Sequence, residues 1–389
     1  MLSFNNTEIA FADKSPKDLN RSYWLFKIVA NNSIVSIGSK LTNIALQLHL
    51  PIKGIIKATI FKQFCGGESI DECESKINAL GRSDIGTILD YSVEGKESEK
   101  DFDACATETI TTIQKSITNK NIPFSVFKVT GVARFALLEK VAAKAKLSDE
   151  EEQEFEKIKQ RIHSICQAAN DAGTPVFIDA EETWIQNAID DIATNMMAKY
   201  NTQQPIVYNT LQMYRKDRLA YLIKAFELAK KSNYFPGFKI VRGAYLEKER
   251  NRAKEKNYPS PIQDTKQNTD NDYDSALSFC LDHIDRIGFC AATHNEKSAM
   301  KLTELMLEKN IHNNNKHIYF AQLLGMSDHI SYNLANAGYN VAKYVPYGPI
   351  KEVLPYLIRR AQENTFVKGQ TGRELGLIVK ETQRRKVSK

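Results

Sequence analysis

Residues 175–199, PVFIDAEETWIQNAIDDIATNMMAK, contain one strand and the helix that follows it. The apolar run at 175–179 is typical of a strand, and it ends on the acidic side chain of Asp179. Over 183–199 the apolar residues recur every three or four positions, as they do on one face of a helix. Similar short apolar runs, separated by helix-length segments, occur on both sides of this unit.

This alternation starts at residue 86 and predicts an α/β fold, a (β/α)8 barrel, which can exceed about 250 residues in one unit. A doubly wound open sheet is the structural alternative. The predicted strands are residues 86–93, 123–130, 175–179, 205–212, 238–244, 289–295, 317–324 and 341–347. The predicted helices include residues 150–172, 183–199, 214–232, 272–287, 296–309 and 327–336.

The flanking segments complete the predicted domain organisation. Residues 1–80 are expected to form a helical arm, residues 81–366 the barrel, and residues 367–389 a basic tail with a solvated, frayed end. The amphipathic stretch 34–61 is expected to pack on the main domain, and a membrane surface is its alternative partner. Residues 246–270, rich in Lys, Glu and Asn, could form an ordered flap or a loose insertion.

Composition limits the classes of function. The chain has 389 residues, and its net charge of +6 is mild for that size, so nucleic-acid binding is not expected. The six cysteines contain no C-x-x-C pair and the seven histidines no H-x-x-x-H pair, which predicts neither a disulfide framework nor a metal site. We expect a reducing, cytoplasmic location with no transit peptide or transmembrane segment, and at most peripheral membrane contact.

Polar residues end nearly every predicted strand. In a barrel these ends gather at one mouth, where the chemistry of such folds takes place. Burying so many unpaired polar groups would be costly, so a lined pocket explains them together. They are Asp90, Glu94, Lys128, Thr130, Asp179, Glu181, Asn209, Gln212, Arg242, Tyr245, Thr293, His294, Asn295, Gln322, Tyr344 and Tyr347.

Single residues of this set also have structural explanations. Lys128 could extend its ammonium group to solvent, Asp179 could cap the helix that begins at Thr183, and His294 could be a satisfied core histidine. A solvated helix face could contain Arg359 and Arg360, which lie one helical turn before Glu363. Arg359 and Glu363 would then form an i,i+4 ion pair. Alternatively the two guanidinium groups could bind one small anion, because their geometry suits carboxylate and phosphate.

Several segments together resemble the proline dehydrogenase family. They are FIDAE (177–181), YNTLQ (208–212), KIVRGAYLE (239–247), THN (293–295), FAQLLGM (320–326), YVPYGP (344–349) and RRAQEN (359–364). The resemblance covers about residues 86–366 and is strongest to the monofunctional branch. It implies a distorted barrel whose last helix lies over the mouth, with FAD as cofactor. It also implies oxidation of L-proline to Δ1-pyrroline-5-carboxylate, with electrons passed to a membrane quinone.

The resemblance also implies roles for individual residues. Lys128, Arg359 and Arg360 would bind the substrate carboxylate, Asp179 would orient the arginines, and Tyr245, Leu323 and Tyr344 would enclose the pyrrolidine ring. Lys239 stands where many relatives carry arginine. Our own addition is Glu94, which we expect to pair with Arg359 or Arg360 as a gate. The cofactor residues would be Gln212, Lys239, Val241, Arg242, Gly243, Ala244, Lys266, Thr293, His294, Asn295 and Glu363.

This assignment agrees with the chemistry of the residues. Hydride transfer needs no nucleophile. It needs a donor carbon held near the flavin, a reacting face without water, and cations that hold the charged substrate. Gly243 would let the backbone approach a bulky cofactor. Arg242 could neutralise the negative charge of a pyrophosphate or of a reduced flavin. The absence of G-x-G-x-x-G argues against a Rossmann site. Two alternatives stay open, a flavin-free lyase with Lys128 as Schiff-base nucleophile and a non-enzymatic proline-sensing or nucleic-acid-binding module.

Overall fold

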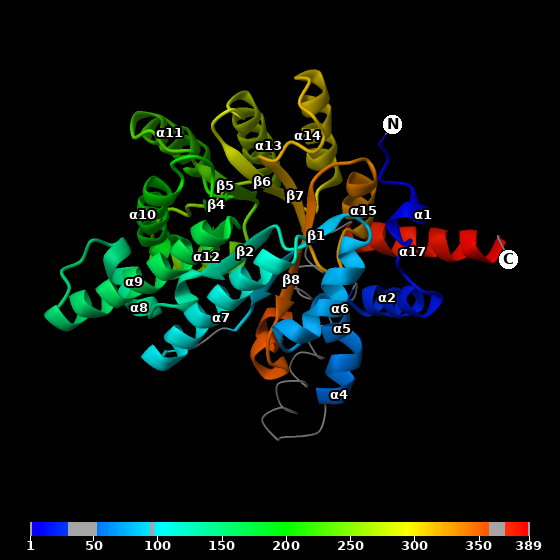
Figure 1. The fold of residues 1–389 in the computed structure, drawn as a ribbon, viewed down its shortest axis with the longest axis horizontal. Helices are drawn as coiled ribbons and strands as arrows, with labels where there is room; N and C mark the ends of the chain where they lie inside the picture. The colour runs from blue at the N-terminus through cyan, green and yellow to red at the C-terminus, as the bar shows by residue number, and fades with distance from the viewer. Residues whose placement is uncertain (1, 30–52, 94–96, 358–369, 388–389) are drawn as a thin grey trace.

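The computed structural model describes residues 2–29, 53–93, 97–357 and 370–387. Eight parallel strands form a closed barrel in chain order (Figure 1), which confirms the predicted barrel and excludes the open sheet. The strands are β1 (Ile85–Tyr91), β2 (Phe124–Lys128), β3 (Val176–Asp179), β4 (Val207–Gln212), β5 (Gly237–Val241), β6 (Gly288–Ala292), β7 (Ile318–Leu323) and β8 (Val341–Tyr347).

The first and last strands close the barrel. They pair over their full length, from Ile85 opposite Val341 to Tyr91 opposite Tyr347. Side chains that alternate along the strands fill the interior, and the rings of Phe124 and Phe177 stack there with centroids 4.4 Å apart. The inside of the barrel is therefore a packed core.

Helices surround the barrel and bury their apolar faces on the outer side of the strands. Many begin with a side-chain cap, and Ser148 and Glu151 form a complete capping box at the start of α9. The helices around the barrel are α6 (Ile70–Gly81), α7 (Glu99–Thr118), α8 (Phe135–Ala142), α9 (Asp149–Ala172), α10 (Thr183–Tyr200), α11 (Arg218–Lys231), α12 (Leu246–Glu255), α13 (Lys266–Asp282), α14 (Glu296–Glu308) and α15 (Asp328–Asn336).

Residues 246–270 are ordered and contain α12 and the start of α13. Glu249 of α12 is buried, and its carboxylate accepts hydrogen bonds of 2.7 Å from both the backbone N–H and the hydroxyl of Thr183. Arg252 stacks over the ring of Trp184 with its guanidinium carbon 4.3 Å from the centroid. These contacts fix α12 to the start of α10, so the segment is not a loose insertion.

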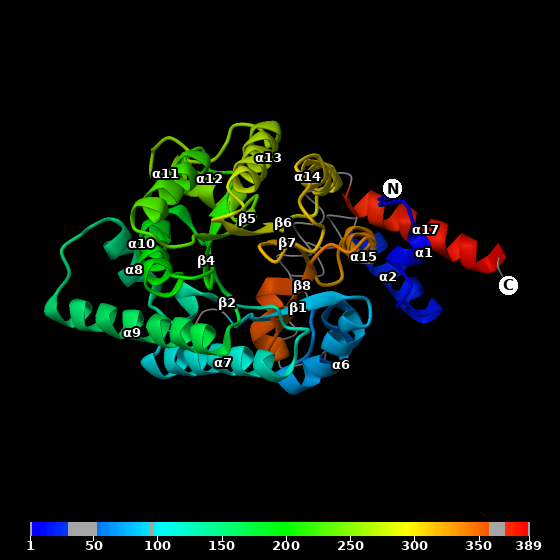
Figure 2. The same ribbon diagram turned by 45° about the horizontal axis from the view of Figure 1, so that its top comes forward.

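The two ends of the chain pack on each other. The arm contains α1 (Thr7–Ala10), α2 (Pro16–Val29), α4 (Lys53–Ile56), a π-helical turn (Lys57–Phe61) and α5 (Lys62–Phe64). Figures 1 and 2 show α17 (Gln370–Val387) beside α1 and α2. Phe11, Leu19 and Phe26 form a small core with Leu377 and Ile378.

The prediction of a frayed, solvated tail is thus wrong for residues 370–387, because α17 buries Leu377 and Ile378 against the arm. The domain boundaries themselves stay a prediction. Most of the amphipathic stretch 34–61 lies outside the described residues. Within the described ranges, no helix is long and apolar enough to cross a bilayer, and no cluster of His, Cys, Asp and Glu could hold a metal ion.

The packing of α17 can be tested by truncating Leu377, which is only 2% exposed. We expect Leu377→Ala to lower the free energy of unfolding by about 2–5 kcal/mol, because it leaves a cavity between α17 and α2. Val379→Ala is the control on the same helix, at a residue 37% exposed, and should change stability by less than about 0.5 kcal/mol. Urea titration measures both values, and a wild-type result for Leu377→Ala would contradict this packing.

Candidate active site

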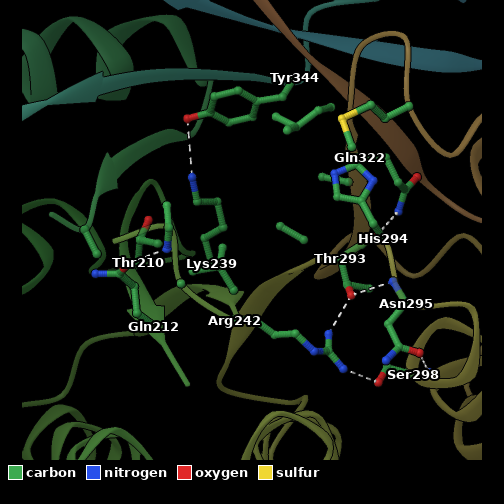
Figure 3. A pocket seen from close by; sticks show the side chains of 18 of the residues that line it. Thr210, Gln212, Lys239, Arg242, Thr293, His294, Asn295, Ser298, Gln322 and Tyr344 are labelled. Atoms are coloured by element: carbon green, nitrogen blue, oxygen red, sulfur yellow. Dashed lines mark hydrogen bonds between the residues drawn. The ribbon is translucent and has the colours of Figure 1, made fainter. Parts of the chain in front are cut away.

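A cavity of about 1050 Å³ opens at the carboxyl ends of the strands. Every described residue to which the family resemblance gave a role lines it: Lys128, Asp179, Gln212, Lys239, Val241, Arg242, Gly243, Ala244, Tyr245, Lys266, Thr293, His294, Asn295, Leu323 and Tyr344. Figure 3 shows Gln212, Lys239, Arg242, Thr293, His294, Asn295 and Tyr344 among them. The prediction that Thr130, Glu181, Asn209 and Tyr347 also line the pocket is wrong, because Thr130 binds Glu181, Asn209 binds Asp190 and Tyr347 binds Glu108 within the protein. The remaining predictions, Glu94, Arg359, Arg360 and Glu363, lie outside the described residues. The structure places these side chains together, and their individual roles stay predictions.

Three side chains from three strands form a buried cluster in the cavity. The Tyr344 hydroxyl donates a 2.7 Å hydrogen bond to the Asp179 carboxylate, and the Lys239 ammonium group pairs with the same carboxylate. Lys239 also donates to the Tyr344 oxygen at 3.3 Å (Figure 3). Asp179 is therefore not a helix cap; the capping position of α10 is Glu182. The cluster fixes the ring of Tyr344 at the cavity wall.

Two lysines and two carboxyl groups line the cavity at the strand ends near this cluster. Lys239 is balanced by Asp179, while Lys128 lies over the ring of Tyr356 with its ammonium nitrogen 6.0 Å from the centroid. Asp90 also lines the cavity, and burial raises its pKa against the opposing attraction of Lys128. The ammonium group of Lys128 at this end of the cavity could bind an anionic group such as a carboxylate.

Arg242 organises a second polar cluster at the end of β5. Its guanidinium donates to Asp270 at 2.7 Å, to the Thr293 hydroxyl at 2.6 Å and to the Ser298 hydroxyl at 2.8 Å (Figure 3). The group also stacks over Tyr273 at 4.2 Å. Arginine has five N–H donors, and these bonds use three of them. A planar cation held in this way can still bind an anionic ligand group.

The turn after β5 requires glycine at position 243. Gly243 has φ +137°, and a Cβ at this position would lie 2.5 Å from the Tyr214 ring. The structure thus shows a close approach to a protein side chain, and the expected approach of the backbone to a cofactor stays a prediction. Next to it, Gln212 accepts a 3.3 Å hydrogen bond from the Ala244 N–H and donates 2.7 Å to the Glu181 carbonyl, which holds the turn against β4.

The segment after β6 presents Thr293, His294 and Asn295. His294 Nδ1 lies 2.9 Å from the Ser327 hydroxyl, so this histidine is tied to the turn before α15. Asn295 caps α14, accepting hydrogen bonds from the N–H groups of the second and third residues after it. The backbone carbonyl of Thr293 accepts a 3.1 Å hydrogen bond from Gln322. Two neighbouring strand ends and two helix starts thus fix this part of the wall.

Sequence patterns alone did not identify several residues that line the cavity. Two of them, Glu296 and Arg373, form an ion pair at 2.8 Å, and His329 Nε2 lies 3.0 Å from the same carboxylate. Burial would raise the pKa of Glu296, but hydrogen bonds from His329 and Arg373 lower it to about 2. Asp270 and Ser298 complete the Arg242 cluster, and Tyr356 comes from the helical residues after β8. No sequence pattern pointed to Arg373, because residues 367–389 were expected to form a solvated tail.

Two atoms of the lining residues indicate an incomplete set of hydrogen bonds. Thr210 Oγ1 and His329 Nδ1 are buried and have no hydrogen-bond partner within the part of the chain that the structure describes. Buried polar atoms are normally paired, so a polar ligand in the cavity would explain both. The donor set and the size of the cavity fit a large anionic cofactor as well as a small substrate.

A (β/α)8 barrel with charged and aromatic side chains around a cavity at its strand ends belongs to the class of barrel enzymes. Residues 73–373 match the family model described as proline dehydrogenase. The chain belongs to the proline dehydrogenase family, and it is an oxidoreductase of that family.

Individual relatives agree with this assignment. Proline dehydrogenase 1, mitochondrial, of Dictyostelium discoideum is 34% identical, with 98% of this chain and 74% of the relative covered. The carbapenem antibiotics biosynthesis protein CarD of Pectobacterium carotovorum is 35% identical, with 83% and 84% covered. Proline utilization A from Bdellovibrio bacteriovorus has the same fold, with a TM-score of 0.74 and 20% identity over 93% of this chain and 38% of its own.

Glu181, at the end of β3 but outside the cavity lining, gives a pH-dependent prediction. Burial raises its pKa from 4.5 to about 7, although the Thr130 N–H donates to it at 3.0 Å. A raised pKa in the folded state means that stability present below pH 4.5 is lost as the pH rises through about 7. Glu181→Gln keeps a neutral side chain at every pH and removes this loss.

We therefore expect the free energy of unfolding of Glu181→Gln, compared with that of wild type, to rise by about 3 kcal/mol between pH 4.5 and pH 8. Thermal unfolding of both proteins across this range measures the difference. A stability difference that does not change with pH would contradict the raised pKa.

Proposed function

We propose that the protein is an FAD-dependent proline dehydrogenase that oxidises L-proline to Δ1-pyrroline-5-carboxylate, the first step of proline catabolism. The observation that carries the proposal is the shared location of the predicted residues at one cavity. They come from strands and turns spread between Lys128 and Tyr344, and the barrel brings them to one mouth. Family membership supports the same conclusion.

Lys128 is the described residue that would bind the substrate carboxylate. It faces the cavity from the end of β2, beside Asp90. Arg359 and Arg360 would complete the clamp, and Glu94 would pair with one of them to close the site. A carboxylate held by several cations fixes the position and orientation of the amino acid.

The aromatic and aliphatic wall would hold the pyrrolidine ring. Tyr344 and Leu323 line the cavity from neighbouring strands, with Tyr245 after β5. The Asp179 carboxylate accepts a hydrogen bond from the Tyr344 hydroxyl, and Lys239 donates to the same hydroxyl oxygen, so the ring of Tyr344 cannot turn away without breaking two contacts. A wall of this kind excludes water from the carbon that loses hydride.

FAD, when bound, would accept the hydride and later release the electrons to a quinone. The residues that would hold it are Arg242, Gln212, Ala244 and the 293–295 segment, with Val241, Gly243, Lys239, Lys266 and Glu363 around them. The spare N–H groups of Arg242 suit a pyrophosphate or the anionic reduced ring. Because a quinone resides in a lipid bilayer, we also propose peripheral contact of the protein with the membrane.

The direct test is the colour of the protein. Purified or FAD-reconstituted protein should be yellow, and its absorption in the blue should bleach under anaerobic conditions when L-proline is added. Bleaching should not occur with glycine, which has no ring, or with D-proline, whose opposite configuration misplaces the ring when the carboxylate is bound. Protein that cannot be reconstituted with FAD would overturn the proposal.

Two lysines of the cavity give a matched pair of substitutions. Lys128→Met should raise the KM for proline about 10-fold to 100-fold, the equivalent of one charge-assisted hydrogen bond, while FAD stays bound. Lys266 lies at the start of α13 with its side chain 69% exposed, and Lys266→Met should weaken FAD binding slightly with an unchanged KM. Steady-state kinetics and FAD titration separate the two effects. An unchanged KM for Lys128→Met would contradict the assigned role.

A further inference from the structure

Helix α17 contacts the wall of the cavity through two consecutive residues near its start. Arg373 lines the cavity itself, and Glu374 is buried beneath the turn that precedes α15. In the sequence, α17 comes after the last barrel strand, β8, and is separated from it by residues 348–369. Its contacts with the wall thus form a link between the C-terminal helix and the active site.

Glu374 binds the backbone of Ser327. Its carboxylate accepts a short hydrogen bond from the Ser327 N–H, and Ser327 is itself fully buried. Ser327 has φ +50° and ψ +40°, a left-handed conformation that is uncommon for residues other than glycine. A strained backbone persists only where its surroundings hold it. Glu374 is the partner that holds the N–H of this turn.

The hydroxyl of Ser327 connects the turn to the cavity. It lies 2.9 Å from His294 Nδ1, and His294 faces the cavity (Figure 3). The Ser327 carbonyl accepts from the Ser331 N–H at 3.1 Å, and the Ser331 hydroxyl donates 2.7 Å to Gln322. Gln322 in turn binds the Thr293 carbonyl. Ser327 therefore supports the 293–295 segment both directly and through α15.

Charged residues around Glu374 stabilise this arrangement. Lys343 of β8 is fully buried, pairs with Asp328 at 2.9 Å and donates to the Met326 carbonyl at 2.5 Å. Lys14 of the arm reaches the same aspartate at 2.8 Å. The turn 326–328 is thus held by groups from the arm, β8 and α17. A buried carboxylate such as Glu374 needs partners of this kind to stay in place.

We infer that Glu374 is a positioning residue for the cofactor site: it fixes Ser327 so that the Ser327 hydroxyl orients His294 toward the cavity. The inference rests on the proposed function, because it takes His294 as a residue that contacts FAD. Arg373 supports the same edge by holding Glu296 together with His329. The C-terminal helix is accordingly part of the active-site architecture.

The test compares FAD binding by apoprotein variants, measured by quenching of flavin fluorescence. Glu374→Ala and Ser327→Ala should each weaken FAD binding about 10-fold, and the double variant should bind no more weakly than Glu374→Ala, because the two residues act in series. Glu374→Gln should bind FAD nearly as wild type, since its amide oxygen still accepts from the Ser327 N–H.

Glu381→Ala is the matched control. Glu381 is buried on the same helix, two turns and about 10 Å further on, and pairs with Arg384 and Arg385 rather than with the cavity wall. Its loss should lower the unfolding temperature without changing FAD affinity. If Glu374→Ala and Ser327→Ala bind FAD as wild type does, or if Glu381→Ala weakens binding equally, the inference is wrong.

A second measurement does not depend on FAD. The imidazole nitrogen shifts of His294 in the labelled apoprotein, assigned with His294→Asn, should change in Ser327→Ala and in Glu374→Ala but not in Glu381→Ala. Unchanged shifts in both variants would overturn the positioning role. If wild-type apoprotein fails to bind FAD, the proposed function fails, and the nitrogen shifts still decide whether Glu374 orients His294.

Discussion

The pairing of β1 with β8 is the constraint on which the rest of the structure depends. It joins residues 85–91 to residues 341–347 and closes eight parallel strands into one barrel. Closure places the carboxyl ends of all strands at one mouth, and the cavity lies there. Lys128 and Tyr344 are far apart in sequence, yet both belong to this cavity. A sheet left open between β1 and β8 would separate these two residues.

The strands were predictable because parallel strands covered on both faces are short apolar runs with clear ends. Each predicted strand overlaps an observed one. Among the helices that were not predicted, α12 and α17 carry few apolar residues of their own. In α12, LEKERNRAKE, almost every residue is charged or polar, and the helix depends on contacts of Glu249 and Arg252 with α10. In α17 only a few apolar residues mark the buried face, and its partner α2 lies at the opposite end of the chain.

The candidate site was predictable where residues belong to strand ends or to motifs of the family. Asp179, Arg242 and His294 meet both conditions. The partners that hold these residues were not predictable, because their positions depend on packing. Ser298 and Asp270 reach Arg242 from two different helices, and Ser327 reaches His294 only because its backbone takes a left-handed conformation. Glu374 stood in a segment whose composition indicated solvent exposure.

The most direct test of the account is a crystal structure of the FAD-loaded protein with a non-oxidisable cyclic carboxylate related to proline. The account predicts the flavin at the barrel mouth, beside Arg242 and the 293–295 segment. It also predicts the ligand ring between the flavin and Tyr344, with its carboxylate within hydrogen-bond distance of Lys128. Flavin bound outside the barrel mouth, or a ligand carboxylate turned away from Lys128, would contradict it.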